Sequence, residues 1–192
     1  MARSVEFNEE EAIQKAMEVF WAKGYHGASL RELTGAMGIN SSSLYNTIGD
    51  KHALFIRCVQ HYTAVRREEL QKRLVSGRAP LEVLVSYIHD AVEMIIDQDN
   101  SCLAIKTVFE VAVNDPRVKS ILKAGSDYDA YFVGELIRRS IAQGALRTDE
   151  EPAFLAEYFI CIWKGWHESF ILNNDPPKLK KMAHYFIASI AN

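Results

Sequence analysis

Apolar residues recur at steps of three and four along most of the chain, which is the spacing of an amphipathic helix. Residues 8–23 show this spacing first. The buried face of that helix is predicted to consist of Ala12, Ile13, Ala16, Met17 and Phe20. Asn8 can cap the helix and Gly24 can end it. No stretch is predicted as a strand, so the pattern indicates an all-α chain.

The stretch from Ala28 to Asp50 predicts two short helices joined by a tight turn. Apolar residues on one face of the first helix are Leu30, Leu33, Ala36 and Met37. Ser29 and Glu32 have the spacing of a capping box at its start. Gly38 stands where a residue with positive φ would end that helix and turn the chain.

The second helix of this stretch has few apolar positions, Leu44 and Ile48, which point back toward the first helix. Its other positions are mostly small and polar, and they are Ser41, Ser42, Ser43, Tyr45, Asn46 and Thr47. Such side chains at a helix N-terminus can approach base edges and phosphates. Lys51 then lies where a cation can meet a phosphate. The pattern fits a DNA-reading helix-turn-helix, and it also fits an ordinary helical corner with a serine-rich turn.

Breaks rich in Pro, Gly, Asn and Asp divide the rest of the chain into further helices. A long helix is predicted over residues 51–75, and residues 76–80 are the clearest break in the chain. Beyond it, helices are predicted over residues 80–97, 101–113, 116–142, 152–173 and 176–190. The last two predicted helices are more apolar than one buried face requires, and such surplus apolar surface is expected of a subunit interface.

The net charge of −3 does not by itself indicate a nucleic-acid binder, so its distribution matters. Residues 29–67 carry five Lys or Arg against two Asp or Glu, whereas residues 1–28 and 68–192 are both net negative. This positive excess coincides with the two-helix stretch, and its small size predicts weak non-specific binding by one subunit. Arg3, in a loose arm over residues 1–7, is a further candidate contact, with a disordered tail as the alternative.

Composition predicts a globular protein, because 48% of the residues are hydrophobic and only five are proline. No apolar run is long enough to span a bilayer and the first 20 residues lack the layout of a signal peptide, so we expect a cytoplasmic protein. Cys58, Cys102 and Cys161 lack metal-ligand spacing. They are expected to be buried, with a thiol sensor or soft-metal site at Cys102 as the alternative. We expect no cofactor and no structural metal.

The run AMEVFWAKGYHGASLRELTGAMGINSSSLYNTIGDKHALF resembles the N-terminal domain of the tetracycline-repressor (TetR/AcrR) family of transcription regulators. The matching residues are Phe20, Gly24, Tyr25, Leu33, Gly38, Ile39, Leu44, Tyr45, Gly49, Lys51, Leu54 and Phe55. Thr47 and Ile48 depart from the family's usual residues, which are Tyr or His and an aromatic. The match covers the first third of the chain closely, and the remainder in helix pattern and length.

The resemblance implies a three-helix DNA-binding domain over residues 1–50, a linking helix over residues 51–75 and a helical ligand-binding and dimerisation domain over residues 76–192. It implies a homodimer that binds a palindromic operator and represses transcription until a small effector binds. The residues that the resemblance and the pattern together assign to DNA are Ser29, Arg31, Ser41, Ser42, Ser43, Tyr45, Asn46, Thr47 and Lys51.

For the C-terminal part, the resemblance implies a dimer contact made by the two last predicted helices. The candidate interface residues are Phe154, Tyr158, Ile162, Phe170, Met182, Phe186 and Ile190. The candidates for lining an effector pocket are Tyr87, His89, Met94, Cys102, Phe109, Tyr128, Tyr131, Phe132, Trp163, Trp166 and His167. Their aromatic excess favours a flat or apolar effector with few hydrogen-bonding groups.

Two other classes of function compete with this hypothesis. An enzyme is disfavoured because the sequence contains no phosphate-binding glycine loop, nucleophile elbow or zinc-protease motif. The other alternative is a dimeric small-molecule-binding protein that does not bind DNA, which the modest positive charge and the unusual Thr47 and Ile48 leave open.

Overall fold

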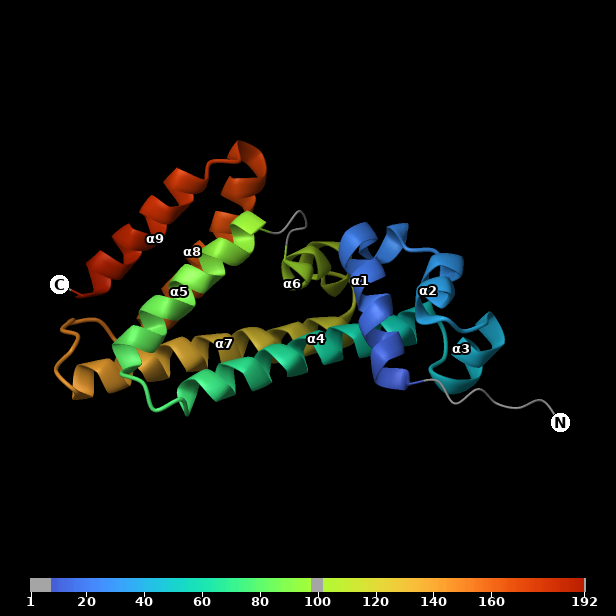
Figure 1. Cartoon of the computed structure of the whole chain (residues 1–192), viewed down its shortest axis with the longest axis horizontal. Coiled ribbons are helices and arrows are strands. Elements are labelled where there is room, and N and C mark those ends of the chain that lie inside the picture. Colours follow the sequence, from blue (N-terminus) through green and yellow to red (C-terminus); the bar gives the residue numbers. More distant parts are fainter. Residues whose placement is uncertain (1–7, 98–101, 192) are drawn as a thin grey trace. The chain divides into compact units, whose positions relative to one another are not determined.

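The computed structural model describes residues 8–97 and 102–191, and every regular element in this part of the chain is helical, as predicted. The elements, shown in Figure 1, are α1 (Glu9–Gly27), α2 (Leu30–Met37), α3 (Ser41–Thr47), α4 (Lys51–Leu74), α5 (Pro80–Asp97), α6 (Leu103–Thr107), η1 (Val108–Ala112), α7 (Pro116–Ala142), α8 (Pro152–Asn173) and α9 (Pro176–Ala191). None of the described helices combines the length and the apolarity that crossing a membrane requires.

Contacts divide the chain into two compact units. Residues 1–65 and 103–122 make up the N-terminal unit, and residues 66–102 and 123–192 make up the C-terminal unit. The helix α4 therefore contributes to both units, and α6 and η1 belong to the N-terminal one. This grouping differs from the three-part division by function, which assigned residues 103–122 to the C-terminal domain; that division stays a prediction.

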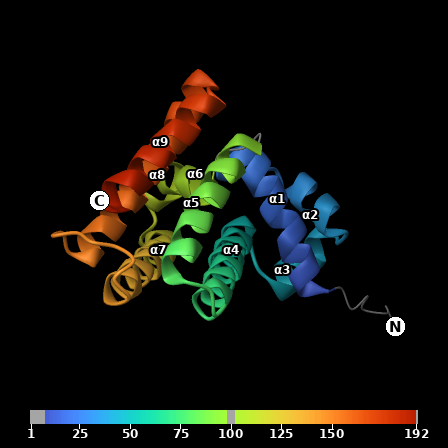
Figure 2. The same ribbon diagram turned by 60° about the vertical axis from the view of Figure 1, so that its left-hand side comes forward.

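The N-terminal unit has a core built from α1 to α4, α6 and η1, with the start of α7. Phe20 of α1 and Phe55 of α4 are both fully buried, and their rings meet edge to face with 4.9 Å between centroids. Leu33 and Leu44 bring α2 and α3 onto the same core. Figure 2 shows α1, α2 and α3 gathered together in this unit. This core fixes the position and orientation of the two short helices, α2 and α3.

The end of α1 is held by residues of α6 and η1. Its backbone leaves the helical region at Gly24, with φ 74° and ψ 172°, and a further turn follows to Gly27. The predicted end at Gly24 therefore marks a kink within the element. Glu110 accepts hydrogen bonds of 2.9 Å from the backbone N–H groups of Tyr25 and His26 beyond this kink. Lys106 donates one of 3.0 Å to the carbonyl of Trp21 before it.

The C-terminal unit packs α5 against α8 and α9 (Figure 1). Phe132 of α7 and Phe159 of α8 are fully buried in it. The ring of Tyr87 on α5 lies 4.9 Å from the ring of Phe132 and 6.0 Å from that of Phe159. Three helices, α5, α7 and α8, thus share one aromatic centre.

Two expectations need correction. The single helix predicted over residues 101–113 is a short α-helix that widens into the π-helix η1, a distinction that hydrophobic spacing does not reveal. Ser101, the first residue of the predicted helix, lies outside the described residues. Cys58 and Cys102 are buried as expected, but Cys161 is exposed. The helix α8 is apolar on more than one side, so its sequence did not reveal which side faces out. The N-terminal arm with Arg3 also lies outside the described residues.

Candidate functional site

The helix α2 begins with the capping box that its sequence predicts. The hydroxyl of Ser29 accepts a hydrogen bond of 3.3 Å from the backbone N–H of Glu32, and the Glu32 carboxylate accepts one of 3.0 Å from the backbone N–H of Ser29. Lys23 of α1 forms an ion pair with the same carboxylate. The hydrogen bond from Lys23, with those from Ser29, lowers the pKa of Glu32 to about 2. These contacts join α2 to the end of α1.

The turn between α2 and α3 depends on Gly38. This residue has φ 70° and ψ 25°, the left-handed conformation that closes a helix at low cost only for glycine. The N–H of Ile39 then bonds the carbonyl of Thr34 at 3.1 Å. Asn40 caps α3, because its side-chain oxygen accepts 2.8 Å and 2.7 Å hydrogen bonds from the N–H of Ser43 and the hydroxyl of Ser42.

The helix α3 turns its polar residues to solvent and its apolar residues inward. Leu44 is fully buried and Ile48 is 9% exposed. Tyr45 is 53% exposed. Of the other candidate DNA residues of this stretch, Ser43 is half-buried. The exposed ones are Ser29, Arg31, Ser41, Ser42, Asn46 and Thr47. The prediction that the polar side of α3 faces solvent is therefore correct for Ser41, Ser42, Tyr45, Asn46 and Thr47. Contact of any candidate residue with DNA stays a prediction.

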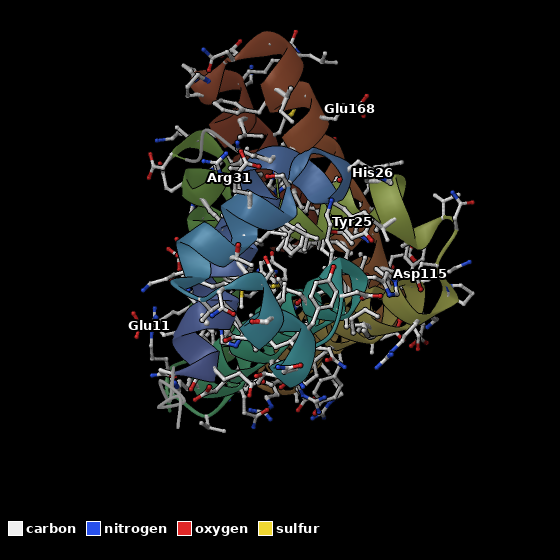
Figure 3. The ribbon with its side chains drawn as sticks, turned by 90° about the vertical axis from the view of Figure 1, so that its right-hand side faces the viewer. Glu11, Tyr25, His26, Arg31, Asp115 and Glu168 are labelled. Carbon is white, nitrogen blue, oxygen red and sulfur yellow. The ribbon has the colours of Figure 1, made fainter. Side chains whose placement is uncertain are left out.

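The start of α4 follows directly. Asp50 caps it by accepting a 2.8 Å hydrogen bond from the backbone N–H of Ala53. Lys51 is half-buried, and its ammonium lies 4.8 Å from the centre of the Tyr25 ring, which attracts the cation. Burial raises the pKa of the Tyr25 hydroxyl, with the charges of Asp50 and Asp115 adding to the shift. Figure 3 shows Tyr25, His26 and Asp115 on one side of the N-terminal unit.

The positive charge near α3 is smaller than the sequence count indicates. Arg57 forms an ion pair with Glu9 of α1. Arg66 belongs to the C-terminal unit, where it pairs with Asp129 at 3.0 Å. Arg31 on α2 is exposed (Figure 3), and Lys51 is half-buried. The cations available to a phosphate in the described part of the N-terminal unit are therefore fewer than the sequence excess suggests.

The candidate effector residues do not form one group. Five of them are buried in the C-terminal unit, and these are Tyr87, Phe132, Trp163, Trp166 and His167. Cys102 is buried too, whereas Tyr128 is half-buried and His89, Met94 and Tyr131 are exposed. Phe109 is 78% exposed and belongs to the N-terminal unit.

Sequence reasoning missed a partly buried ion pair beside the five buried candidates. The Nε of Arg66 donates to both carboxylate oxygens of Asp129, at 3.0 and 3.2 Å, and its Nη2 donates to the Tyr87 hydroxyl at 2.9 Å. Burial raises the pKa of Asp129, and Arg66 opposes that shift. Burial also raises the pKa of Tyr87 to about 12. Arg66 and Asp129 are 63 residues apart, so no local pattern signals their pairing.

The candidate interface residues fall into two groups. Phe154 and Tyr158 are 55% and 50% exposed, and Ile162, Phe170 and Met182 are half-buried. Phe186 and Ile190 are buried within the subunit. An apolar groove of about 380 Å³ runs between α8 and α9, and it is lined by residues such as Tyr158, Ile162, Met182 and Tyr185. Tyr185, on the same helix as Met182 and Phe186, is 76% exposed.

The geometry of the N-terminal unit defines a class of protein. The short helices α2 and α3 are joined by a glycine in the left-handed conformation. The outer side of α3 is exposed and polar, and its inner side packs with α1 and α2 on an apolar core. This is the arrangement of a helix-turn-helix.

Comparison with known proteins agrees with this class. Residues 12–58 match the family model of bacterial regulatory proteins of the tetR family. The HTH-type transcriptional regulator YezE of Bacillus subtilis is 30% identical over 163 residues, which cover 82% of this chain and 83% of YezE. The HTH-type transcriptional repressor BdcR of Escherichia coli is 30% identical over 115 residues, which cover 60% of this chain and 58% of BdcR.

A solved structure of the TetR family transcriptional regulator CifR, a cysteine mutant complexed with 26bp double-strand operator DNA, is also similar. It is 26% identical with a TM-score of 0.79, and the match covers 97% of this chain and 98% of CifR. The chain belongs to the tetR family of bacterial regulatory proteins and is a transcriptional regulator of the helix-turn-helix type. The resemblance in its first third is thereby confirmed.

Proposed function

We propose that this regulator is a repressor that binds a palindromic operator as a homodimer and releases it when a small effector binds to the C-terminal unit. The outward side of α3 reads the bases, and Arg31 and Lys51 contact phosphates. The ring of Tyr45 and the short side chains around it meet the major groove.

One observation supports this proposal above the others. The helix α3 buries Leu44 and exposes a continuous set of hydroxyl and amide groups at its N-terminal end. Asn and Ser side chains can exchange hydrogen bonds with base edges, and helix N-termini favour phosphate oxygens.

The proposed dimer uses the outward side of α8 and α9. At least half of the surface of Phe154, Tyr158 and Tyr185 is exposed there, beside the apolar groove between the two helices. A second copy would cover the same surface about a two-fold axis. Two α3 helices related by that axis would then address half-sites spaced by whole turns of DNA. The relative BdcR, a repressor, supports repression, and the structure of CifR with operator DNA supports operator binding.

Effector control requires that the two units be coupled. The helix α4 is continuous from Lys51 in the N-terminal unit to Leu74 in the C-terminal unit, so a change at its C-terminal end can act on its start. An effector lowers operator affinity only if it binds the arrangement unfit for DNA more tightly. A nearly complete release requires a preference of roughly 5 kcal/mol.

Selection of bound sequences from a random duplex pool tests the proposal most directly. We expect a palindromic consensus. A protein that forms dimers yet enriches no sequence would be the small-molecule-binding protein without DNA binding, and it would reject the proposal. Tyr45→Ala should abolish the enrichment. Tyr131→Ala, at a tyrosine of α7 that is 56% exposed, is the matched control and should leave it intact.

A further inference from the structure

Two buried polar atoms on α8 have no hydrogen-bond partner among the described residues. They are Nε1 of Trp163 and Nε2 of His167. Trp163 is 6% exposed and His167 is 4% exposed, so solvent cannot easily supply the missing partners. The two residues are four apart on one helix and lie on the same side of it. Their rings are perpendicular, with 4.9 Å between centroids.

The surroundings of these two atoms are polar. The guanidinium carbon of Arg66 lies 5.4 Å from the centre of the Trp163 ring. Arg66 in turn bonds Asp129 and the hydroxyl of Tyr87. We refer to Arg66, Tyr87, Asp129, Trp163 and His167 as the polar cluster, in which α4, α5, α7 and α8 each contribute at least one residue.

A folded protein satisfies nearly all of its buried polar groups, so two neighbouring exceptions are informative. An indole N–H only donates, and it therefore needs an acceptor. Burial and the positive charge of Arg66 lower the pKa of His167 to about 4, so its imidazole is neutral at pH 7 and Nε2 can donate or accept according to tautomer. Asp129 balances the charge of Arg66. The cluster thus offers an unused donor in a nearly neutral setting.

The apolar side of the cluster is aromatic. The rings of Phe132 and Phe159 pack on the ring of Tyr87, whose hydroxyl binds Arg66. The ring of Trp166 lies 6.0 Å from that of Phe159. Aromatic faces pack best on flat groups. A ligand in contact with both sides of the cluster would therefore be flat and apolar, with its oxygen at one end.

We propose that the polar cluster binds an effector with a flat apolar body and a carbonyl or carboxylate oxygen, which accepts a hydrogen bond from Nε1 of Trp163 and is bound by His167. This inference rests on the proposed effector-controlled function and narrows the effector to a chemical class. It also separates Trp163 and His167, as hydrogen-bonding residues, from the aromatic neighbours that supply apolar contact.

The test uses the full chain labelled with 15N in its three tryptophans, Trp21, Trp163 and Trp166, without DNA. Acetophenone and ethylbenzene are nearly the same shape, but only acetophenone carries an acceptor oxygen. We expect acetophenone to shift the indole N–H resonance of Trp163 downfield and to bind about tenfold more tightly than ethylbenzene, the worth of one hydrogen bond. Trp21, in the N-terminal unit, should not respond.

Benzoate distinguishes the two forms of the oxygen. If the natural effector is an acid, benzoate should bind more tightly than acetophenone. Its binding should be accompanied by proton uptake at His167, because a nearby carboxylate stabilises the protonated imidazole. The reverse order identifies a neutral carbonyl compound, and either order supports the proposal. Equal or tighter binding of ethylbenzene overturns it, and so does a Trp163 resonance that none of the three compounds moves.

Two variants test the role of the indole N–H. Trp163→Phe removes this N–H and should erase the preference for acetophenone over ethylbenzene, whereas Trp21→Phe, in the N-terminal unit, should keep it. If Trp163→Phe fails to fold, the comparison of ligands on the unaltered chain still decides the outcome. Operator binding is measured separately. Probe binding without DNA binding rejects only the proposed function, and DNA binding without a probe response rejects only this inference.

Discussion

The carboxylate of Glu110 lies 2.9 Å from the backbone nitrogen of Tyr25, 85 residues earlier in the chain. It bonds the N–H of His26 as well, and so supplies acceptors for two backbone groups left without helical partners by the kink at Gly24. Glu110 stands in the π-helix η1. The last turn of α1, which leads into α2, is therefore fixed by a residue far away in sequence.

Replacement of Glu110 by Ala should destabilise the protein by about 2 kcal/mol, because two charge-assisted hydrogen bonds to backbone N–H groups are lost. Glu110→Gln keeps one acceptor oxygen and should lose about half as much. Glu150→Ala, in the exposed loop before α8, should have little effect. Denaturant unfolding of the three variants measures these differences. A loss for Glu110→Ala no larger than that for Glu150→Ala would contradict the role assigned to this carboxylate.

Two glycines of the helix-turn-helix, Gly35 and Gly38, allow a matched comparison. Gly38 has φ 70°, and a Cβ added there would meet no atom within 4 Å, so Gly38→Ala should cost only the strain of the left-handed conformation, about 1 kcal/mol. Gly35 lies within α2 and also has open space around it. Gly35→Ala should therefore stabilise the protein by about 0.5–1 kcal/mol through helix propensity. Thermal unfolding should move in opposite directions for the two, and a shift of the same sign would refute the argument.

The features that the sequence revealed depend on near neighbours. The capping box of Ser29 and Glu32 and the glycine turn at Gly38 involve residues a few positions apart, and their spacing alone predicts them. The ion pair of Arg66 and Asp129 joins residues 63 apart. Nothing in the local pattern marks either residue, because each reads as part of a charged surface until the fold brings them together.

Apolar spacing was also insufficient where a helix is apolar on several sides. Phe186 and Ile190 of α9 were grouped with the interface, although both are buried within the subunit. Tyr185, one position before Phe186, is 76% exposed. The spacing predicts that a helix has an inner side. It does not predict which apolar residues lie on that side when the helix has more apolar residues than one side can hold. Packing against α5 and α8 makes that choice here.

The stability of the C-terminal unit should depend on pH through His167. Its pKa is lowered from 6.5 to about 4, so between those values the unfolded chain binds a proton that the folded chain does not. The free energy of unfolding should therefore be unaffected by His167 above about pH 6.5 and should fall as the pH drops toward 4. Below pH 4, His167 should cause no further loss. His167→Gln should unfold with a weaker dependence across this window, measured by denaturant titration at several pH values. His89→Gln, at an exposed histidine of α5, should keep the dependence of the unaltered chain.

Lys51 should contribute to operator affinity through charge alone. Lys51→Ala should weaken binding to all sequences alike and should reduce the slope of log K against log salt by about two for a dimer, since each phosphate contact contributes about 0.9. Lys72→Ala is the control, because Lys72 lies near the other end of α4 and pairs with Glu68. Fluorescence anisotropy with a labelled duplex at several salt concentrations gives both slopes. An unchanged slope for Lys51→Ala would remove Lys51 from the phosphate contacts.

Tyr158 offers the sharpest test of the proposed dimer. It is 50% exposed on α8, stacks on Phe154 with 6.4 Å between ring centroids, and lines the apolar groove with α9. A charge introduced there would be buried without a partner if a second copy covers this surface. Tyr158→Glu should therefore convert the dimer to a monomer, as measured by sedimentation equilibrium.

The control for that experiment is Tyr131→Glu. Tyr131 is 56% exposed, so both substitutions start from tyrosines of similar exposure in the same unit, but Tyr131 lies on α7. If Tyr131→Glu remains a dimer and Tyr158→Glu does not, the effect belongs to the surface of α8 and α9. Operator binding should be lost with the dimer, because a single α3 addresses only half of a palindrome. A Tyr158→Glu protein that is still dimeric would require the two subunits to meet elsewhere, and the assigned spacing of the two α3 helices would no longer hold.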